Sequence, residues 1–318
     1  MAPEIVKSTA GNAAAPVVGA SKHAYVTFLA GAGDYVKGVV GLAKGLRKVG
    51  AAFPLVVAIL ADVPVEHRRI LVEQGCVLRE IEPAFPCAGA DQNHAYVRNY
   101  FLLNYCKLRL WEFVEYERMI YMDADVQVFD NVDHLFELPS GYFYGVVDCV
   151  CEMSGDVCPQ KLRWPHELGP QPPFYLNGGM FVFQPDLTTY HHLIHTLSIT
   201  PPTPFAEQDF LNMFFREKMK AISPEYNLLV AMLWRHPEAV DVEKAKVVHY
   251  CVAGSKPWRF TGEEENMERE DMKMLVNKWW DIYNDASLDF NVAQRLTKGL
   301  PLSREVVVVH YRSASSAA

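Results

Sequence analysis

Residues 118–125 read RMIYMDAD, a short strand pattern that ends at once in two aspartates. Side chains at positions i and i+2 of an extended chain point to the same side, so Asp123 and Asp125 are predicted to lie together. Open α/β sheets bind ligands at the carboxyl ends of their strands, and carboxylate oxygens suit Mg²⁺ and Mn²⁺. Aspartate also favours turns, so the pair alone leaves both a metal site and a simple turn open.

The chain before this strand alternates between strand and helix patterns. Three short apolar runs indicate strands, at residues 24–29, 55–60 and 76–81. Two segments with helical spacing separate them, residues 36–49 and 65–74, and each is followed by a glycine. This order predicts an α/β fold with a Rossmann-like, mainly parallel sheet flanked by helices.

The chain after residue 100 adds elements of both kinds. Helices are expected near 104–114 and over 205–215, and strands over 176–184 and 245–249. Residues 159–174 are proline-rich and are predicted to be largely loop, and the charged run 263–273 is predicted to be a solvated helix face.

The composition is that of a globular protein. Of 318 residues, 50% are hydrophobic and 21% are charged, and the formal net charge is −8. A net acidic chain lacks the positive field that attracts phosphate backbones, so no nucleic-acid partner is expected. No apolar run reaches the roughly 18 residues of a membrane helix and no secretory signal pattern opens the chain, so a cytoplasmic location away from membranes is predicted.

We expect three parts along the chain: a flexible tail over 1–22, one α/β catalytic domain over 23–262, and a helical extension with a tail over 263–318. The seven cysteines are predicted to be free thiols of a reducing compartment. Cys149, Cys151 and Cys158 lie close in sequence, but their spacing is not that of a zinc ribbon. Nothing in the sequence indicates the oligomeric state.

A second motif follows the strand expected at 245–249. His249 ends that strand, where a neutral imidazole suits a metal site, although for this residue alone a hydrogen-bonded core histidine is the simpler explanation. Gly254 allows the backbone to approach a ligand closely, and Lys256 supplies a compact positive charge for phosphate oxygens.

Two more motifs offer polar groups for a sugar. In Asn177-Gly178-Gly179 the amide both donates and accepts hydrogen bonds, although paired glycines also fit a bulge or a tight turn. Glu207-Gln208-Asp209 opens an expected helix, where acidic residues are also favoured by the helix dipole.

Taken in this order, the four motifs resemble glycosyltransferase family 8, and the resemblance covers roughly residues 25–258. It implies a GT-A fold that binds a nucleotide sugar and Mn²⁺, with Mg²⁺ as a substitute, and transfers the sugar with retention of configuration. By the same resemblance, Asp123, Asp125 and His249 are the metal ligands. Lys256, together with Gly254, then contacts the diphosphate.

The resemblance also assigns residues to the substrates. The uridine is expected against Phe28, Leu29, Ala30 and Tyr35, the donor sugar beside Lys107, Asn177, Gly178 and Gln208, and the acceptor near Asn227. The expected catalytic set is Lys107, Gln208, Asp123 and Asp125.

Within the family, the chain is most similar to plant enzymes that move galactose from UDP-galactose to myo-inositol, towards raffinose-type oligosaccharides of the stress response. The similarity rests on AGAGDYVKGVVGLAKGLRKVG at 30–50, on VVHYCVAGSKPWRFTG at 247–262, and on the small residues at 313–318. Front-face attack by an inositol hydroxyl is favoured, because the residue matched to a nucleophile is the amide Gln208; the flanking Glu207 and Asp209 leave a double displacement open.

Other functions remain as alternatives at this point. The first is a self-glucosylating primer protein, which needs an acceptor tyrosine where this chain has Trp234. The others are a cell-wall galacturonosyltransferase-like enzyme, a non-catalytic module that binds nucleotide sugars, and a metal-dependent hydrolase.

Overall fold

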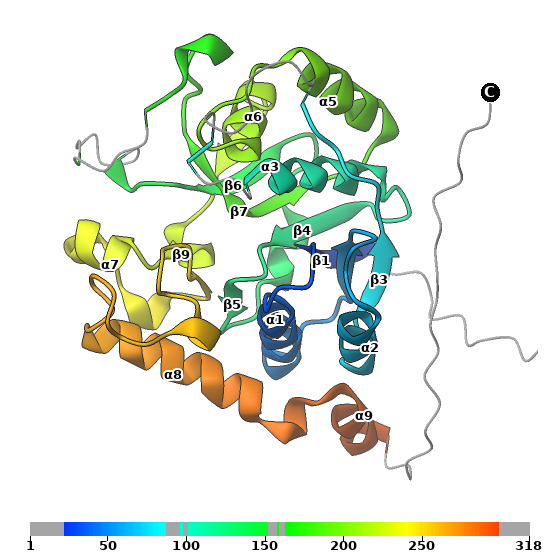
Figure 1. Cartoon of the computed structure of the whole chain (residues 1–318), viewed down its shortest axis with the longest axis vertical. Helices are drawn as coiled ribbons and strands as arrows, with labels where there is room; N and C mark the ends of the chain where they lie inside the picture. The colour runs from blue at the N-terminus through cyan, green and yellow to red at the C-terminus, as the bar shows by residue number, and fades with distance from the viewer. Residues whose placement is uncertain (1–21, 87–95, 98–100, 152–157, 159–162, 299–318) are drawn as a thin grey trace, which may run out of the picture.

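The computed structural model describes residues 22–86, 96–97, 101–151, 158 and 163–298. Its centre is a seven-stranded sheet with the order β3-β2-β1-β4-β7-β6-β8 (Figure 1). The strands are β1 (His23–Leu29), β2 (Leu55–Ile59), β3 (Val77–Glu80), β4 (Arg118–Met122), β6 (Phe143–Val147), β7 (Leu176–Phe183) and β8 (Met219–Ala221).

The sheet is mainly parallel, as predicted. β1 pairs parallel with β2 and β4, β2 with β3, and β6 with β8. β7 runs against the others, because it pairs antiparallel with both β4 and β6. The central strands β4, β6 and β7 are buried along their whole length, which is what a sheet covered on both faces requires.

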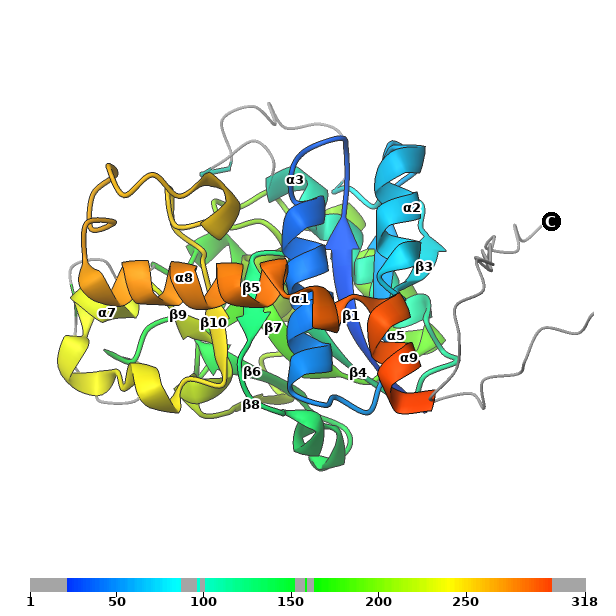
Figure 2. The ribbon, with the colours of Figure 1, turned by 90° about the horizontal axis from the view of Figure 1, so that it is seen from below.

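Helices cover both faces of this sheet (Figures 1 and 2). On one face lie α1 (Val36–Lys48) and α2 (Val65–Glu73), and on the other α3 (Phe101–Asn104), α5 (Leu187–Ile199) and α6 (Glu207–Phe214). The core under α5 and α6 is rich in aromatic rings, with Trp111 stacked against Phe181 and Phe215. The core under α1 is mainly aliphatic.

A smaller sheet brings distant segments together beside the end of β4. Its strands are β5 (Val126–Val128), β10 (Val247–His249) and β9 (Leu228–Leu229), in the order β5-β10-β9. β10 pairs antiparallel with β5, so His249 lies opposite Val126, the residue directly after Asp125. The strand expected at 245–249 therefore exists, and it belongs to this second sheet.

Two expected helices differ from the prediction. The helix expected at 104–114 is α3 followed by a 3₁₀ helix, Tyr105–Glu112, in which nearly every side chain is buried. Packing on all sides holds this segment, and a pattern search for one apolar face does not anticipate such packing. Within the charged run 263–273 only the last residues are helical, because the next helix begins at Glu270.

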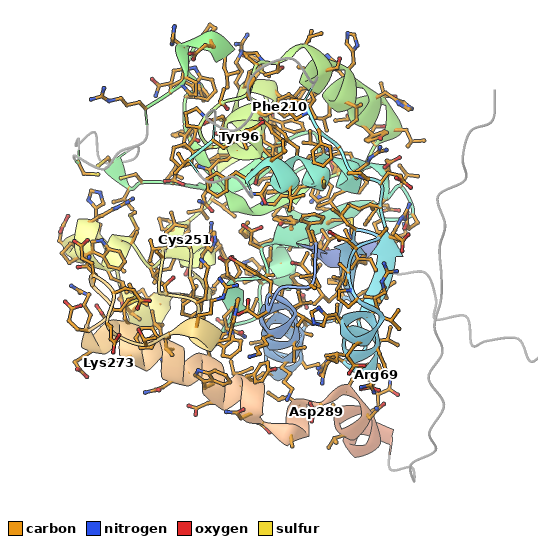
Figure 3. All side chains as sticks on the ribbon, viewed as in Figure 1. Arg69, Tyr96, Phe210, Cys251, Lys273 and Asp289 are labelled. Carbon is orange, nitrogen blue, oxygen red and sulfur yellow. The ribbon has the colours of Figure 1, made fainter. Side chains whose placement is uncertain are left out.

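Among the described residues, three α-helices follow β9: α7 (Met232–Arg235), α8 (Glu270–Asn284) and α9 (Phe290–Lys298). α8 packs across α1 (Figure 2) where Gly41 leaves room, since a Cβ on Gly41 would lie 2.8 Å from the ring of Trp279. Lys44 of α1 donates a hydrogen bond of 2.7 Å to the carbonyl of Tyr283 and forms an ion pair of 2.8 Å with Asp289, just before α9 (Figure 3).

The helical part of the expected extension therefore packs directly on the sheet domain, while the division at residue 262 stays a prediction. Within the part of the chain described above, no helix is both long and apolar enough to cross a membrane. Of the expected N-terminal tail only Lys22 is described, and the expected extension is described as far as Lys298.

Candidate active site

A pocket of about 520 Å³ opens where β1 and β4 end. Its wall includes the segments after β1, β4 and β10, the first residues of β7 and α6, and residues from α3, α7 and the end of β6. Cys251, labelled in Figure 3, lines it from the side of the smaller sheet. This is the place where open α/β sheets bind their ligands, and the volume suits a small organic molecule.

The three predicted metal ligands converge at this pocket. The Nε2 of His249 lies 3.3 Å from Asp125 Oδ1 and 3.9 Å from Asp123 Oδ2. One ligand atom from each residue lies within 4.8 Å of the other two, so a single cation can reach all three. Two carboxylates with one imidazole form a donor set that suits a divalent cation such as Mn²⁺.

Backbone pairing explains why these residues meet. Asp123 follows β4, and its amide donates a hydrogen bond of 2.8 Å to the carbonyl of Gly179 in β7. The amide of Tyr250, directly after β10, donates one of 3.0 Å to the carbonyl of Asp125. The aspartates are thus held between the two sheets, and β10 delivers His249 beside them.

Lys256 adds a positive charge to the pocket wall. Its Nζ lies 2.8 Å from Asp125 Oδ2 and also donates to the carbonyl of Tyr250. Burial lowers the pKa of Lys256, but the charge of Asp125 outweighs it, so the pKa lies above its ordinary value and the ammonium keeps its charge. For Asp125 the effects have the opposite signs. Burial favours a higher pKa, but Lys256 and His249 more than offset it, so the pKa of Asp125 lies below its ordinary value.

Lys107 lies beneath the aspartates. Its Nζ forms ion pairs with Asp123 Oδ1 at 2.9 Å and with Glu207 Oε1 at 2.6 Å, and the residue is 1% exposed. Burial lowers the pKa of Lys107, but these two carboxylates outweigh that effect and raise it above its ordinary value. Tyr121 also donates to Asp123 Oδ1, so both partners fix that carboxylate. Lys107 therefore positions Asp123 from below.

A second group of polar side chains faces the other end of the pocket. The Oε1 of Gln208 accepts a hydrogen bond of 2.8 Å from the amide of Gly178, and its Nε2 donates one of 3.2 Å to Asp148 Oδ2. Asn177 donates to the same carboxylate oxygen at 2.9 Å. Burial raises the pKa of Asp148, although the two amides that donate to it oppose the rise. The three side chains thus form one connected network.

The two carboxylates beside Gln208 are engaged elsewhere. Asp209 is fully buried, accepting a hydrogen bond of 2.5 Å from the hydroxyl of Tyr175 and one of 2.9 Å from the amide of Phe205. Glu207 forms the ion pair with Lys107 described above. Asp209 thus holds the loop before α6, and Glu207 balances the buried lysine.

Most of the residues assigned to substrates line the pocket: Phe28, Leu29, Ala30, Tyr35, Asn177, Gly178, Gln208 and Lys256, together with Asp123, Asp125 and His249. Lys107 and Asn227 lie behind the wall, and Asn227 donates a hydrogen bond of 3.0 Å to Asn177 Oδ1. Gly254 is outside the lining; its φ is +77° and it packs against Glu264. The roles assigned to these residues remain predictions.

Two charged lining residues, Asp148 and Arg235, did not emerge from the sequence. Asp148 directly follows β6, as Asp123 follows β4. An acidic residue at the end of a strand could therefore have pointed to Asp148 in the sequence. Arg235 ends the four-residue helix α7 and has no comparable signal.

The sequence matches the model of glycosyl transferase family 8 over residues 26–262. Galactinol synthase 2 of Solanum lycopersicum is 58% identical over 319 residues, which cover 94% of each chain. Galactinol synthase 4 of Arabidopsis thaliana is 63% identical over 281 residues, which cover 85% of this chain and 83% of its own.

Solved structures share the fold. The galactosyltransferase LgtC, in complex with donor and acceptor sugar analogues, superposes with a TM-score of 0.55 at 16% identity and covers 81% of this chain and 95% of its own. The glycosyltransferase GlyE of Streptococcus pneumoniae TIGR4 gives 0.58 at 17% identity, over 87% of this chain and 64% of its own. At these identities the likeness establishes the architecture alone.

Proposed function

This chain belongs to glycosyltransferase family 8, with the GT-A fold of that family, and we propose that it is a galactinol synthase. It moves galactose from UDP-galactose to myo-inositol and releases UDP. One observation carries the proposal: a pocket at the strand ends joins two aspartates, a histidine and a charged lysine. The choice of galactose and inositol is supported by relatives of that name at 57–63% identity.

We propose Mn²⁺ as the cation, held by Asp123, Asp125 and His249, with Mg²⁺ as a substitute. When bound, the cation supplies positive charge for the oxygens of the leaving diphosphate. Lys256, on the same wall, adds a second fixed charge beside those oxygens. Lys107 keeps the Asp123 carboxylate oriented through their ion pair. Because Lys107 is buried behind the pocket wall, it does not contact the substrates itself.

The remaining wall orients the two substrates. Phe28, Leu29, Ala30 and Tyr35 offer the uridine an apolar and aromatic surface. Asn177 and Gln208 face the donor sugar, and their hydrogen bonds to Asp148 fix both amides. Amides held in this way present donors and acceptors in fixed positions to sugar hydroxyls.

Retention of configuration is best explained by front-face attack of the inositol hydroxyl on the anomeric carbon. The C–O bond to the diphosphate breaks, the new C–O bond forms on the same face, and the departing phosphate takes the hydroxyl proton. Asp209 accepts a hydrogen bond from Tyr175, and Glu207 forms an ion pair with Lys107. Because both carboxylates are held in these interactions, neither is free to act as a nucleophile. A galactosyl adduct trapped on either carboxylate, or on Asp148, would overturn this mechanism.

The test is product analysis with UDP-galactose and Mn²⁺, with and without myo-inositol. An inositol-dependent galactoside that disappears with EDTA supports the proposal, and UDP-glucose serves as the donor control. Release of UDP without an inositol product overturns the acceptor. Hexose units found by mass spectrometry on the purified chain would instead indicate a self-glucosylating protein, a function that the Trp234 side chain disfavours because it has no hydroxyl. The cytoplasmic location stays a prediction, which fractionation of the source tissue can test.

A further inference from the structure

A second group of metal-ligand residues lies outside the pocket just described. Cys149 and Cys151 follow β6 within four residues, Cys158 comes shortly afterwards, and His236 directly follows α7. The Nε2 of His236 lies 3.1 Å from Cys149 Sγ and 3.3 Å from Cys151 Sγ. Cys149 Sγ lies 3.6 Å from Cys158 Sγ, and all four ligand atoms lie within 4.8 Å of one another.

These separations match a tetrahedral zinc site. With Zn–S bonds of about 2.3 Å and a Zn–N bond of about 2.0 Å, ideal tetrahedral geometry places sulfurs about 3.8 Å apart and sulfur about 3.5 Å from nitrogen. The observed distances of 3.1 to 3.6 Å are close to these values.

The surroundings of the group also fit a metal. Cys149, Cys151 and His236 are buried, and the described cysteines form no disulfide bond. The second ring nitrogen of His236 faces Glu238 Oε1 at 3.8 Å, and carboxylates near that nitrogen commonly orient metal-bound histidines. The amide of Cys158 donates a hydrogen bond of 3.2 Å to Cys151 Sγ, which suits a sulfur that carries negative charge.

We propose that Cys149, Cys151, Cys158 and His236 bind a structural Zn²⁺ ion. Three sulfur ligands and one imidazole select zinc over the hard cations that suit Asp123, Asp125 and His249. Four protein ligands complete a tetrahedron and leave no position for substrate, so the ion is structural. Binding displaces the protons of the three thiols to solvent and involves no oxidation or reduction.

The position of the group indicates what the ion stabilises. Asp148, next to Cys149, and Arg235, next to His236, both line the active-site pocket. They come from segments far apart in the sequence, and the four ligands connect those segments directly behind the pocket wall. A zinc ion there fixes Asp148, and through it the amides of Asn177 and Gln208.

The spacing of these four residues in the sequence did not predict a metal site. The three cysteines lack the pairing of a zinc ribbon, and the fourth ligand stands far downstream, after a helix of four residues. The expectation of free thiols is therefore replaced for these three cysteines by the proposed zinc site.

Metal analysis of the whole protein, purified without chelators or an affinity metal, tests the proposal first. We expect one zinc per chain, retained through dialysis against a mild chelator that strips the Asp123–Asp125–His249 site. A chain that holds no zinc, or a mass lower by two hydrogen atoms that reveals a disulfide between Cys149 and Cys158, overturns it.

Cobalt substitution identifies the ligands without relying on activity. Co²⁺ added to protein from which a strong chelator has also removed the zinc should give thiolate-to-cobalt charge-transfer absorption, which a cation held by Asp123, Asp125 and His249 cannot produce because these three ligands contain no sulfur. The absorption should persist in Asp125→Asn and in Cys76→Ala, a buried cysteine outside the group, and should weaken in Cys158→Ser. Charge-transfer absorption that is absent, or equal in Cys158→Ser and the parent protein, contradicts the assignment. The zinc content of the parent protein decides the matter even if a variant fails to fold.

Discussion

Gly179 lies directly against the imidazole of His249: a Cβ built on Gly179 would be 2.1 Å from Cε1 and 2.6 Å from Nδ1 of that ring. The glycine is therefore required for space, since its backbone φ is not in the left-handed region. It also accepts the hydrogen bond from the amide of Asp123. One residue of β7 thus sets the distance between two of the proposed metal ligands.

Gly179→Ala is expected to displace the His249 ring while β7 keeps its pairing. A misplacement of about 1 Å at a reacting centre can reduce turnover by about 100-fold, and we expect at least that loss. Overpacking should lower stability by about 1–3 kcal/mol. Galactosyl transfer and urea unfolding measure the two effects. Gly33→Ala is the control, because a Cβ there has open space; equal activity of both variants would contradict the role of Gly179.

Asp125→Asn should remove most metal-dependent turnover. The substitution takes a charge from the proposed cation site and an ion-pair partner from Lys256, so we expect a loss of at least ~100-fold. Titration calorimetry with Mn²⁺ should show weaker binding. Asp130→Asn changes an exposed aspartate two residues after β5 and should behave like the parent protein. Undiminished Mn²⁺ binding by Asp125→Asn would show that the cation lies elsewhere.

Lys107→Met should destabilise the fold by about 3–5 kcal/mol, because it leaves the buried carboxylate of Glu207 and the partly buried carboxylate of Asp123 without their shared cation. Adding Glu207→Gln to Lys107→Met removes one of those charges and should restore part of the lost stability. Urea unfolding of the parent, both single variants and the double variant completes the cycle. If the two effects simply add, the ion pair between Lys107 and Glu207 has no energetic coupling, and Glu207 does not balance the buried charge of Lys107.

Asp148→Asn should raise thermal stability at neutral pH. Burial raises the pKa of Asp148 above its ordinary value of 3.8, so the folded protein carries a disfavoured charge at any pH above the raised pKa. That cost disappears as the pH falls through the folded pKa towards 3.8, and the advantage of the variant should shrink over the same window. Turnover should fall by about tenfold, because a hydrogen-bonded charge that orients Asn177 and Gln208 is lost. A melting-temperature difference that does not change with pH would contradict the burial of this charge.

Trp279→Ala should destabilise the whole enzyme by about 3–5 kcal/mol. The indole is 1% exposed, fills the space above Gly41 and stacks on Tyr283 at 4.8 Å, so its removal leaves a cavity between α8 and α1. Lys273→Ala, on the exposed side of α8, is the matched control. A single cooperative transition shifted as a whole would show that α8 unfolds with the sheet domain, whereas an early separate transition would indicate an independent extension.

Local sequence patterns predicted most of the fold. Short apolar runs at β1, β2 and β4 and the helical spacing of α1 predicted a parallel α/β sheet, because side-chain periodicity follows directly from backbone geometry. The same patterns predicted the aspartates at the end of β4. They did not predict the 3₁₀ helix Tyr105–Glu112, which is held by burial on nearly every side.

Contacts between distant segments were decided by the tertiary structure alone. Nothing near Gly179 in the sequence reveals that His249 packs on it, and nothing near Cys158 points to His236. The sequence by itself determined the elements, the acidic strand end and the family, because each rests on neighbouring residues or on ordered motifs. The pairing of β10 with β5, the burial of Lys107 and the gathering of three cysteines around one imidazole depend on how strands and loops pack, and packing joins residues that share no local pattern.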